Sequence, residues 1–181
     1  MRRIFIGTLV VLTIALINGC ANRKITRVDP NETIDLSGRW NDSDSRLVSE
    51  EMIGDLLTSA WIPRYLKAND KRPVVVVGLV ENKSHEHINS ETFIKDVEKA
   101  IIRDGNIRLV VAGEKRNELR KERAEQQDYA SPETTKKWGK ELGADFILQG
   151  TINSIVDSYK KQKVVTYQID LQLTNIETNE V

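Results

Sequence analysis

The stretch Arg72-Pro73-Val74-Val75-Val76-Val77-Gly78-Leu79-Val80 decides the fold of this chain. An unbroken run of β-branched residues after a proline predicts a central strand that is covered on both faces. Two more apolar runs, residues 107–112 and 144–152, predict further strands, and the second continues in amphipathic form to about Tyr159. Residues 165–173 alternate apolar and polar side chains, which predicts a half-buried strand that closes an antiparallel hairpin.

Helical periodicity fills the intervals around these strands. Apolar residues at steps of three and four from Val48 to Trp61 predict a helix that packs on a core, and we expect Pro63 to interrupt it. Asn89 or Ser90 can cap a second helix. The remaining helices are predicted at residues 90–104, 114–127 and 131–143. Helices interspersed with strands place the chain in the α/β (α+β) class.

The helix predicted at residues 114–127 carries ordered charge but little apolar surface. Its residues Arg116, Arg120, Arg123 and Gln127 are spaced four, three and four apart, so they lie on one stripe. Two interpretations remain open. The helix is either a solvated element whose charges provide solubility, or a recognition face for a partner protein. The second interpretation makes these four residues the candidate partner-binding site, because arginine is enriched at interfaces.

The first twenty residues have the layout of a secretory signal. Arg2 and Arg3 precede an apolar run at residues 4–17, which at about 14 residues is shorter than the roughly 20 that a bilayer core requires. The segment Leu16-Ile17-Asn18-Gly19-Cys20 resembles a bacterial lipobox, in which the cysteine is lipidated and becomes the new amino terminus. An ordinary signal peptide followed by an incidental cysteine is the alternative.

This reading divides the chain into three parts. Residues 1–19 are predicted to be a lipoprotein signal peptide, residues 20–33 a lipidated flexible tether, and residues 34–181 a globular domain. The residue after the cysteine is Ala21 rather than Asp. By resemblance to enterobacterial lipoproteins, this favours the outer membrane over retention at the inner one. Because residues 177–180 form a turn shortly before the last residue, we expect the domain to lack its final strand.

Composition and motifs argue against catalysis. Charged residues make up 30% of the chain and its formal net charge is zero, so no strong field attracts nucleic acid. The sequence contains neither a Gly-x-Ser-x-Gly nucleophile elbow nor a glycine-rich phosphate loop. His85 and His87 could ligate a metal with a nearby glutamate, but no cysteine or third histidine completes a zinc set. We therefore expect no cofactor, no catalytic residue and no metal. We interpret the segment around His85 and His87 as a polar loop.

Several blocks together resemble a known family. They are residues 34–45 (Ile-Asp-Leu-Ser-Gly-Arg-Trp-Asn-Asp-Ser-Asp-Ser), the strand at 74–82, residues 119–127, Leu142-Gly143-Ala144-Asp145, Leu148-Gln149-Gly150, and residues 167–175. In this order, and with the lipobox, they resemble the LpoB family of outer-membrane lipoproteins. The resemblance implies a mixed β-sheet flanked by helices, similar to the amino-terminal domain of TolB, and a lipid-anchored protein without an active site. It also implies a partner: LpoB proteins activate a class A penicillin-binding protein, which synthesises peptidoglycan.

Two other function classes remain as alternatives. Leu142-Gly143-Ala144-Asp145 before a strand is also similar to subunits of curli-secretion channels, which would make the chain part of a lipoprotein oligomer. Only residues 165–173 approach the alternation that a membrane hairpin needs, so we expect a monomer. A metal-dependent hydrolase centred on His85 and His87 is the third class, and bound metal in purified protein would identify it.

Overall fold

The computed structural model describes residues 27, 29, 32–136 and 140–181. The signal peptide, Cys20 and most of the tether predicted from the sequence lie outside these residues. Residues 33–181 form one compact unit, and all that follows concerns this unit. Its elements in chain order are α2 (Asp42–Thr58), α3 (Trp61–Asn69), β1 (Val74–Asn82), α4 (Ser90–Asp104), β2 (Arg108–Val110), α5 (Gly113–Tyr129), β3 (Phe146–Tyr159) and β4 (Gln162–Asn175).

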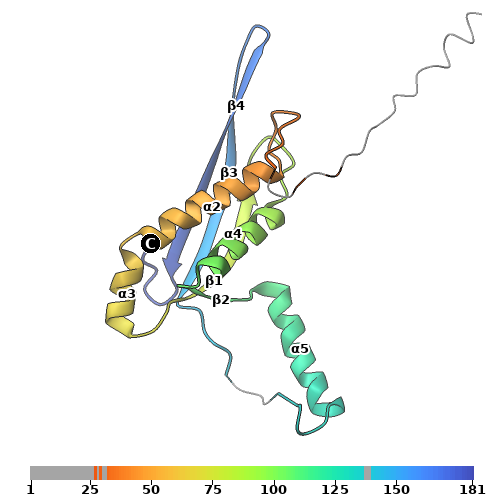
Figure 1. Cartoon of the computed structure of the whole chain (residues 1–181), viewed down its shortest axis with the longest axis vertical. Helices are drawn as coiled ribbons and strands as arrows, with labels where there is room; N and C mark the ends of the chain where they lie inside the picture. Colours follow the sequence, from red (N-terminus) through yellow and green to blue (C-terminus); the bar gives the residue numbers. More distant parts are fainter. Residues whose placement is uncertain (1–26, 28, 30–31, 137–139) are drawn as a thin grey trace, which may run out of the picture. The chain divides into compact units, whose positions relative to one another are not determined.

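The four strands form one mixed sheet in the order β2-β1-β3-β4 (Figure 1). β1 runs parallel to both β2 and β3, with Val75 opposite Leu109 on one side and Phe146 on the other. β3 and β4 form an antiparallel hairpin joined by a two-residue turn. The predicted central strand and the predicted hairpin are therefore confirmed, and so is the mixed α+β class.

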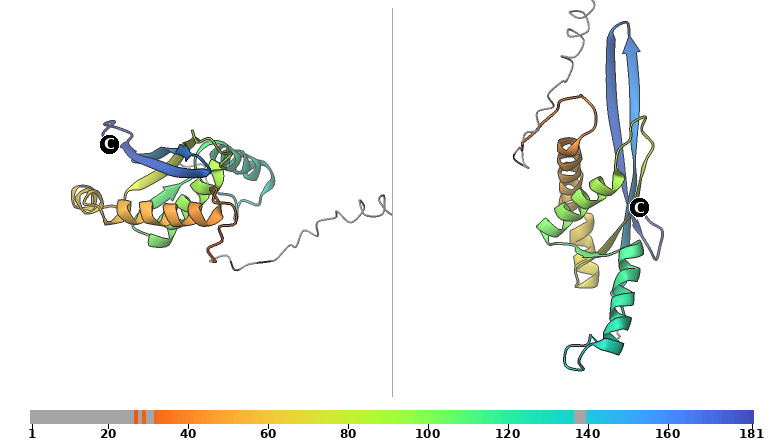
Figure 2. Two further views of the ribbon diagram at one scale, coloured as in Figure 1. Left: turned by 90° about the horizontal axis from the view of Figure 1, so that it is seen from above. Right: turned by 90° about the vertical axis from the view of Figure 1, so that its right-hand side faces the viewer.

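Helices α2 and α4 cover one face of this sheet (Figure 2). α4 contributes the fully buried Phe93, Val97 and Ile101, and α2 contributes Ile53. The strands meet them with side chains from alternate positions, as a pleated sheet requires. These strand residues are Val75, Val77, Val80, Leu148 and Ile152. The apolar periodicity of the sequence identified this core.

Helix α2 begins with a reciprocal cap. The Asn41 side chain accepts a hydrogen bond from the Ser43 N–H at 2.8 Å, and the Asp44 carboxylate accepts one from the Asn41 N–H at 2.9 Å. Such a cap satisfies N–H groups that have no partner within the helix. We expected Pro63 to interrupt this helix, but α2 already ends at Thr58, before the proline. It lies in the first turn of the separate helix α3, where its missing N–H has no helical acceptor to lose.

The prediction of a helix at residues 131–143 is wrong. Residues 132–134 form a turn, and residues 140–144 have no regular structure. Two glutamine side chains of α5 bind backbone groups that would otherwise form hydrogen bonds within a helix. The Lys136 N–H donates to Gln126 Oε1 at 3.3 Å, and Gln127 Nε2 donates to the Lys136 carbonyl at 2.9 Å. The strand predicted at residues 107–112 also shortens to β2, because it pairs with only Val74–Val76 at the sheet edge.

The β3–β4 hairpin extends beyond the end of β1. The last residue of β1 to pair with β3 is Asn82, opposite Ile152, and beyond that point β3 pairs only with β4 (Figure 1). Within the described residues, no helix combines the length and the apolar character that crossing a bilayer would require.

Candidate functional site

The candidate stripe on α5 contacts the chain's own next segment. Arg120 donates from Nε and Nη2 to the two carboxylate oxygens of Glu141, each at 2.9 Å, and Arg123 donates to the same carboxylate at 3.2 Å. Arg116 Nε donates to the Val111 carbonyl at 2.9 Å. The fourth residue, Gln127, donates to the Lys136 carbonyl. Arg120, Arg123 and Gln127 therefore tie Lys136 and Glu141 of the returning chain to α5.

Bidentate pairing dominates the electrostatics of this stripe. The hydrogen bond from Arg120, assisted by the charges of Arg123 and Arg116, lowers the pKa of Glu141 below its usual range. The Arg120 side chain remains 50% exposed and that of Arg123 34% exposed, so a partner could still reach both guanidinium groups. No residue of α5 is buried, which means that polar contacts rather than a core hold this helix. Whether the stripe recognises a partner stays a prediction.

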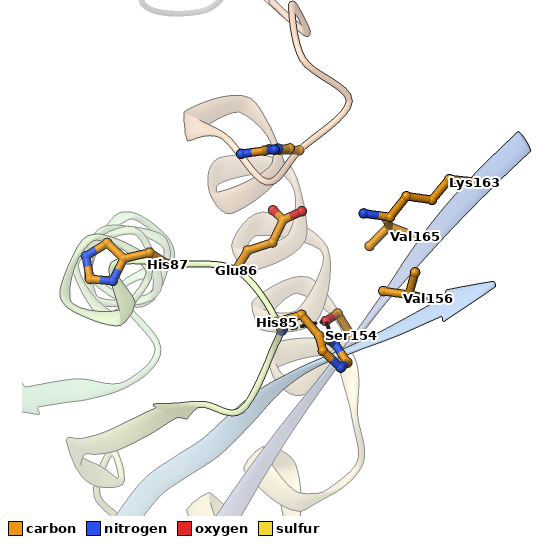
Figure 3. Close-up of a pocket in the computed structure, with 8 residues that line it drawn as sticks. His85, Glu86, His87, Ser154, Val156, Lys163 and Val165 are labelled. Atoms are coloured by element: carbon orange, nitrogen blue, oxygen red, sulfur yellow. Dashed lines mark hydrogen bonds between the residues drawn. The ribbon is translucent and has the colours of Figure 1, made fainter. Parts of the chain in front are cut away.

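The two histidines lie in the loop after β1, beside a polar pocket of about 240 Å³. The His85 N–H donates to Ser154 Oγ at 2.9 Å, and the ring Nδ1 of His85 lies 3.0 Å from the same oxygen. Figure 3 shows the ring of His87 pointing away from the other labelled side chains. Among the described residues, no group of three or more His, Cys, Asp or Glu side chains gathers as a metal site would require.

A hydrogen-bonded cluster next to this pocket was missed by the sequence reasoning. The Tyr167 hydroxyl donates to Glu86 Oε2 at 2.8 Å and accepts from the Trp40 N–H at 3.0 Å. The rings of Trp40 and Tyr167 meet edge to face with centroids 5.3 Å apart. Burial raises the pKa of Tyr167, and the hydrogen bond to Glu86 raises it further. The cluster fixes the loop that carries both histidines against β4 and the segment before α2.

Asp145 joins the starts of β1 and β3. Its carboxylate accepts from the Val74 N–H at 2.8 Å and pairs with the Lys71 ammonium at 3.1 Å, while its own N–H donates to the Val74 carbonyl at 2.8 Å. Burial alone would raise the pKa of Asp145. The hydrogen bonds from Tyr65, Val74 and Lys71 outweigh burial and lower this pKa. The carboxylate in the Leu-Gly-Ala-Asp block therefore has a structural role at this strand junction.

Comparison with protein-family models places the chain. The model described as "Peptidoglycan-synthase activator LpoB" matches residues 44–181, which include all but the first two residues of α2, every later helix and the whole sheet. The chain belongs to the LpoB family. The family is named for a regulatory role, the activation of a peptidoglycan synthase, rather than for a reaction of its own.

Two solved LpoB domains were also found among similar structures. The LpoB C-terminal domain from Escherichia coli is 18% identical, with a TM-score of 0.40, over 76% of this chain and 91% of that one. The LpoB C-terminal domain from Salmonella enterica is 18% identical, with a TM-score of 0.36, over 66% of this chain and 84% of that one. A search of curated proteins found no match. The assignment to the LpoB family rests on the family model.

Proposed function

We propose that this chain is an outer-membrane lipoprotein that faces the periplasm and that binds and activates a class A penicillin-binding protein. The observation that carries the proposal is the match of residues 44–181 to the LpoB family of peptidoglycan-synthase activators. In this proposal, residues 1–19 are removed on export, Cys20 carries the lipid, residues 20–33 are the tether, and residues 34–181 bind the synthase. The chain acts as a monomer and performs no catalysis.

Activation by binding needs a difference in affinity. A ligand shifts a conformational equilibrium only if it binds one state more tightly than the other. The domain would therefore bind the active conformation of the synthase in preference to the inactive one. The same family match favours this activator over the alternatives of a curli-like oligomer and a metal-dependent hydrolase.

The lipid anchor and the activity can be tested separately. Cys20→Ser removes the thiol that would be acylated, and we expect the variant to leave the outer-membrane fraction, since stable anchoring depends on the acyl chains. We expect the purified variant to stimulate glycan polymerisation by a class A synthase in detergent, where no anchor is needed. Retention of Cys20→Ser in the outer-membrane fraction would refute the lipid anchor. Absence of stimulation would refute the activator.

We propose the α5 stripe, Arg116, Arg120, Arg123 and Gln127, as one contact of the synthase. The double variant Arg120→Ala/Arg123→Ala removes two guanidinium groups and also breaks their bonds to Glu141. Glu141→Ala breaks the same bonds but keeps both arginines, so it serves as the matched control. We expect the double variant to stimulate the synthase about tenfold less than the unmodified chain does. This corresponds to a loss of about 1–2 kcal/mol of binding free energy, as expected when interface arginines are removed.

Synthase stimulation and thermal unfolding of both variants provide the measurement. Glu141→Ala is expected to keep the stimulation of the unmodified chain, because its arginines are free to bind the partner. Equal losses in the two variants would mean that the stripe acts only by holding Lys136 and Glu141 of the returning chain, and would remove it from the partner contact.

A further inference from the structure

The end of the β3–β4 hairpin lies apart from the packed domain. Residues 155–166, here called the distal hairpin, pair only with each other, and Figures 1 and 2 show them projecting beyond the helices. Across the described residues, no hydrogen bond or ion pair connects these twelve residues to another element; the last such bond is that of Ser154 to His85. An isolated two-stranded ribbon is marginally stable in water. The ribbon therefore projects into solvent without support from the core.

Large apolar side chains lie exposed on this ribbon. Ile155 is 60% exposed, Tyr159 70% and Val164 61%. Side chains alternate between the two faces of a strand, so Ile155 and Tyr159 lie on the same face of β3. Contiguous exposed apolar surface on a folded domain marks a binding site more often than chance. Tyrosine is moreover one of the residues in which interfaces are enriched.

The charge around this apolar surface is positive. Lys160, Lys161 and Lys163 surround the turn, against a single acid, Asp157. Lys163 also lines the polar pocket at the base of the distal hairpin, together with Arg39. Neither Arg39 nor Lys163 forms an ion pair with any residue that the structure describes. Both cations share this pocket with the carboxylate of Glu86.

A pocket lies at the opposite face of the ribbon, because Val156, Lys163 and Val165 alternate with Ile155, Tyr159 and Val164 along the paired strands. It is lined by Arg39, His85, Glu86, His87, Ser154, Val156, Lys163 and Val165. Figure 3 shows the Lys163 side chain pointing across it toward Glu86. Glu86 already accepts the Tyr167 hydroxyl, and the buried Ser154 hydroxyl contacts His85. The Glu86 carboxylate in this pocket would repel an incoming acidic side chain, so the pocket is not part of the proposed contact.

We propose that the distal hairpin docks onto an acidic protein surface of the synthase, through the lysines around its turn and the apolar face that carries Ile155, Tyr159 and Val164. This inference rests on the proposed function, since it names the surface that the partner presents. Charge complementarity selects an acidic partner, and the exposed Ile155, Tyr159 and Val164 provide the apolar centre of the contact.

This surface is separate from the α5 stripe. The ribbon views place the distal hairpin at one end of the sheet and α5 near the other end (Figures 1 and 2). Substitutions in one are therefore not expected to disturb the other. Each contact can be removed without changing the folded core between them.

The test compares charge reversals of equal size on the full chain. Lys161→Glu/Lys163→Glu changes the distal hairpin, and Arg64→Glu/Lys67→Glu makes the same change in charge on exposed positions of α3. Binding to the purified class A synthase is measured together with stimulation of glycan polymerisation. Co-sedimentation with phosphatidylglycerol vesicles measures membrane binding. We expect the hairpin variant to bind the synthase about tenfold to a hundredfold more weakly, because like charges would face each other, and the α3 variant to bind as the unmodified chain does.

The outcomes separate this inference from the proposed function. Weaker synthase binding by the hairpin variant alone supports the docking surface, even if the unmodified chain binds without stimulating, which would refute only the activator. Equal binding by both variants overturns the docking surface and leaves the activator standing. Loss of vesicle binding in the hairpin variant with unchanged synthase binding also overturns it, in favour of a membrane contact. An unmodified chain that does not bind the synthase refutes both.

Discussion

Replacing Phe93 with Ala is expected to lower the free energy of unfolding by about 3–5 kcal/mol, the range for a fully buried aromatic side chain. Phe93 is 0% exposed and lies at the centre of the contact between α4 and the sheet. Its ring meets that of Trp40 edge to face, with centroids 6.3 Å apart. The substitution therefore leaves a cavity and also removes an aromatic contact of the segment that precedes α2.

Urea unfolding followed by circular dichroism and by tryptophan fluorescence measures this change. Tyr129→Ala is the matched control, since it also truncates an aromatic residue on a helix, but one that is 88% exposed. We expect it to change the free energy of unfolding by less than about 0.5 kcal/mol. A loss below about 1 kcal/mol for Phe93→Ala would contradict the packing of α4 described above.

A single added methyl group at Gly150 is expected to lower the free energy of unfolding by about 3 kcal/mol, at the upper end of the range for overpacked sites. A Cβ at this position would overlap the backbone oxygen of Asp170 and lie 2.7 Å from Leu171 Cδ2. Gly150 pairs with Leu171 in the centre of the β3–β4 ladder, and the obstacle is backbone, which cannot rotate away as a side chain can. Gly150→Ala should force the two strands apart at this point.

Gly54→Ala provides the opposite expectation within the same chain. Gly54 lies within α2, and a Cβ there would meet nothing within 4 Å. Alanine should therefore stabilise the domain by about 0.5–1 kcal/mol, because glycine loses more backbone freedom in a helix. Thermal unfolding of both variants and hydrogen exchange of β4 amides measure the effects. Similar stabilities for the two variants would show that the close approach at Gly150 is wrong.

These stability variants complement the functional ones. Phe93 and Gly150 lie in the packed domain, whereas Lys161 and Lys163 lie on the distal hairpin and Arg120 on α5. A fall in synthase stimulation without a fall in stability is therefore expected only for the exposed residues. This separation lets one set of measurements distinguish a damaged fold from a lost contact.

Local sequence patterns predicted most of the elements. The β-branched run at residues 74–80 identified the central strand, and the helix predicted at residues 90–104 is α4. The capping residue ahead of α4 was also readable from the sequence. The sequence pattern was misleading at residues 131–143, where a good capping sequence suggested a helix. Instead, side chains of α5 form hydrogen bonds with the backbone N–H and carbonyl of Lys136. Cys20, the signal peptide and the tether remain predictions.

The sequence by itself determined which faces are buried, because burial repeats with the period of a helix or a strand within a few neighbouring residues. It also determined the family, since the LpoB family model matches the sequence over residues 44–181. Only the tertiary structure decided that the α5 arginines meet Glu141, that Tyr167 meets Glu86 and Trp40, and that the hairpin projects beyond β1. Those contacts join residues as many as 127 positions apart, and which of many equivalent carboxylates or hydroxyls becomes a partner depends on the path of the whole chain.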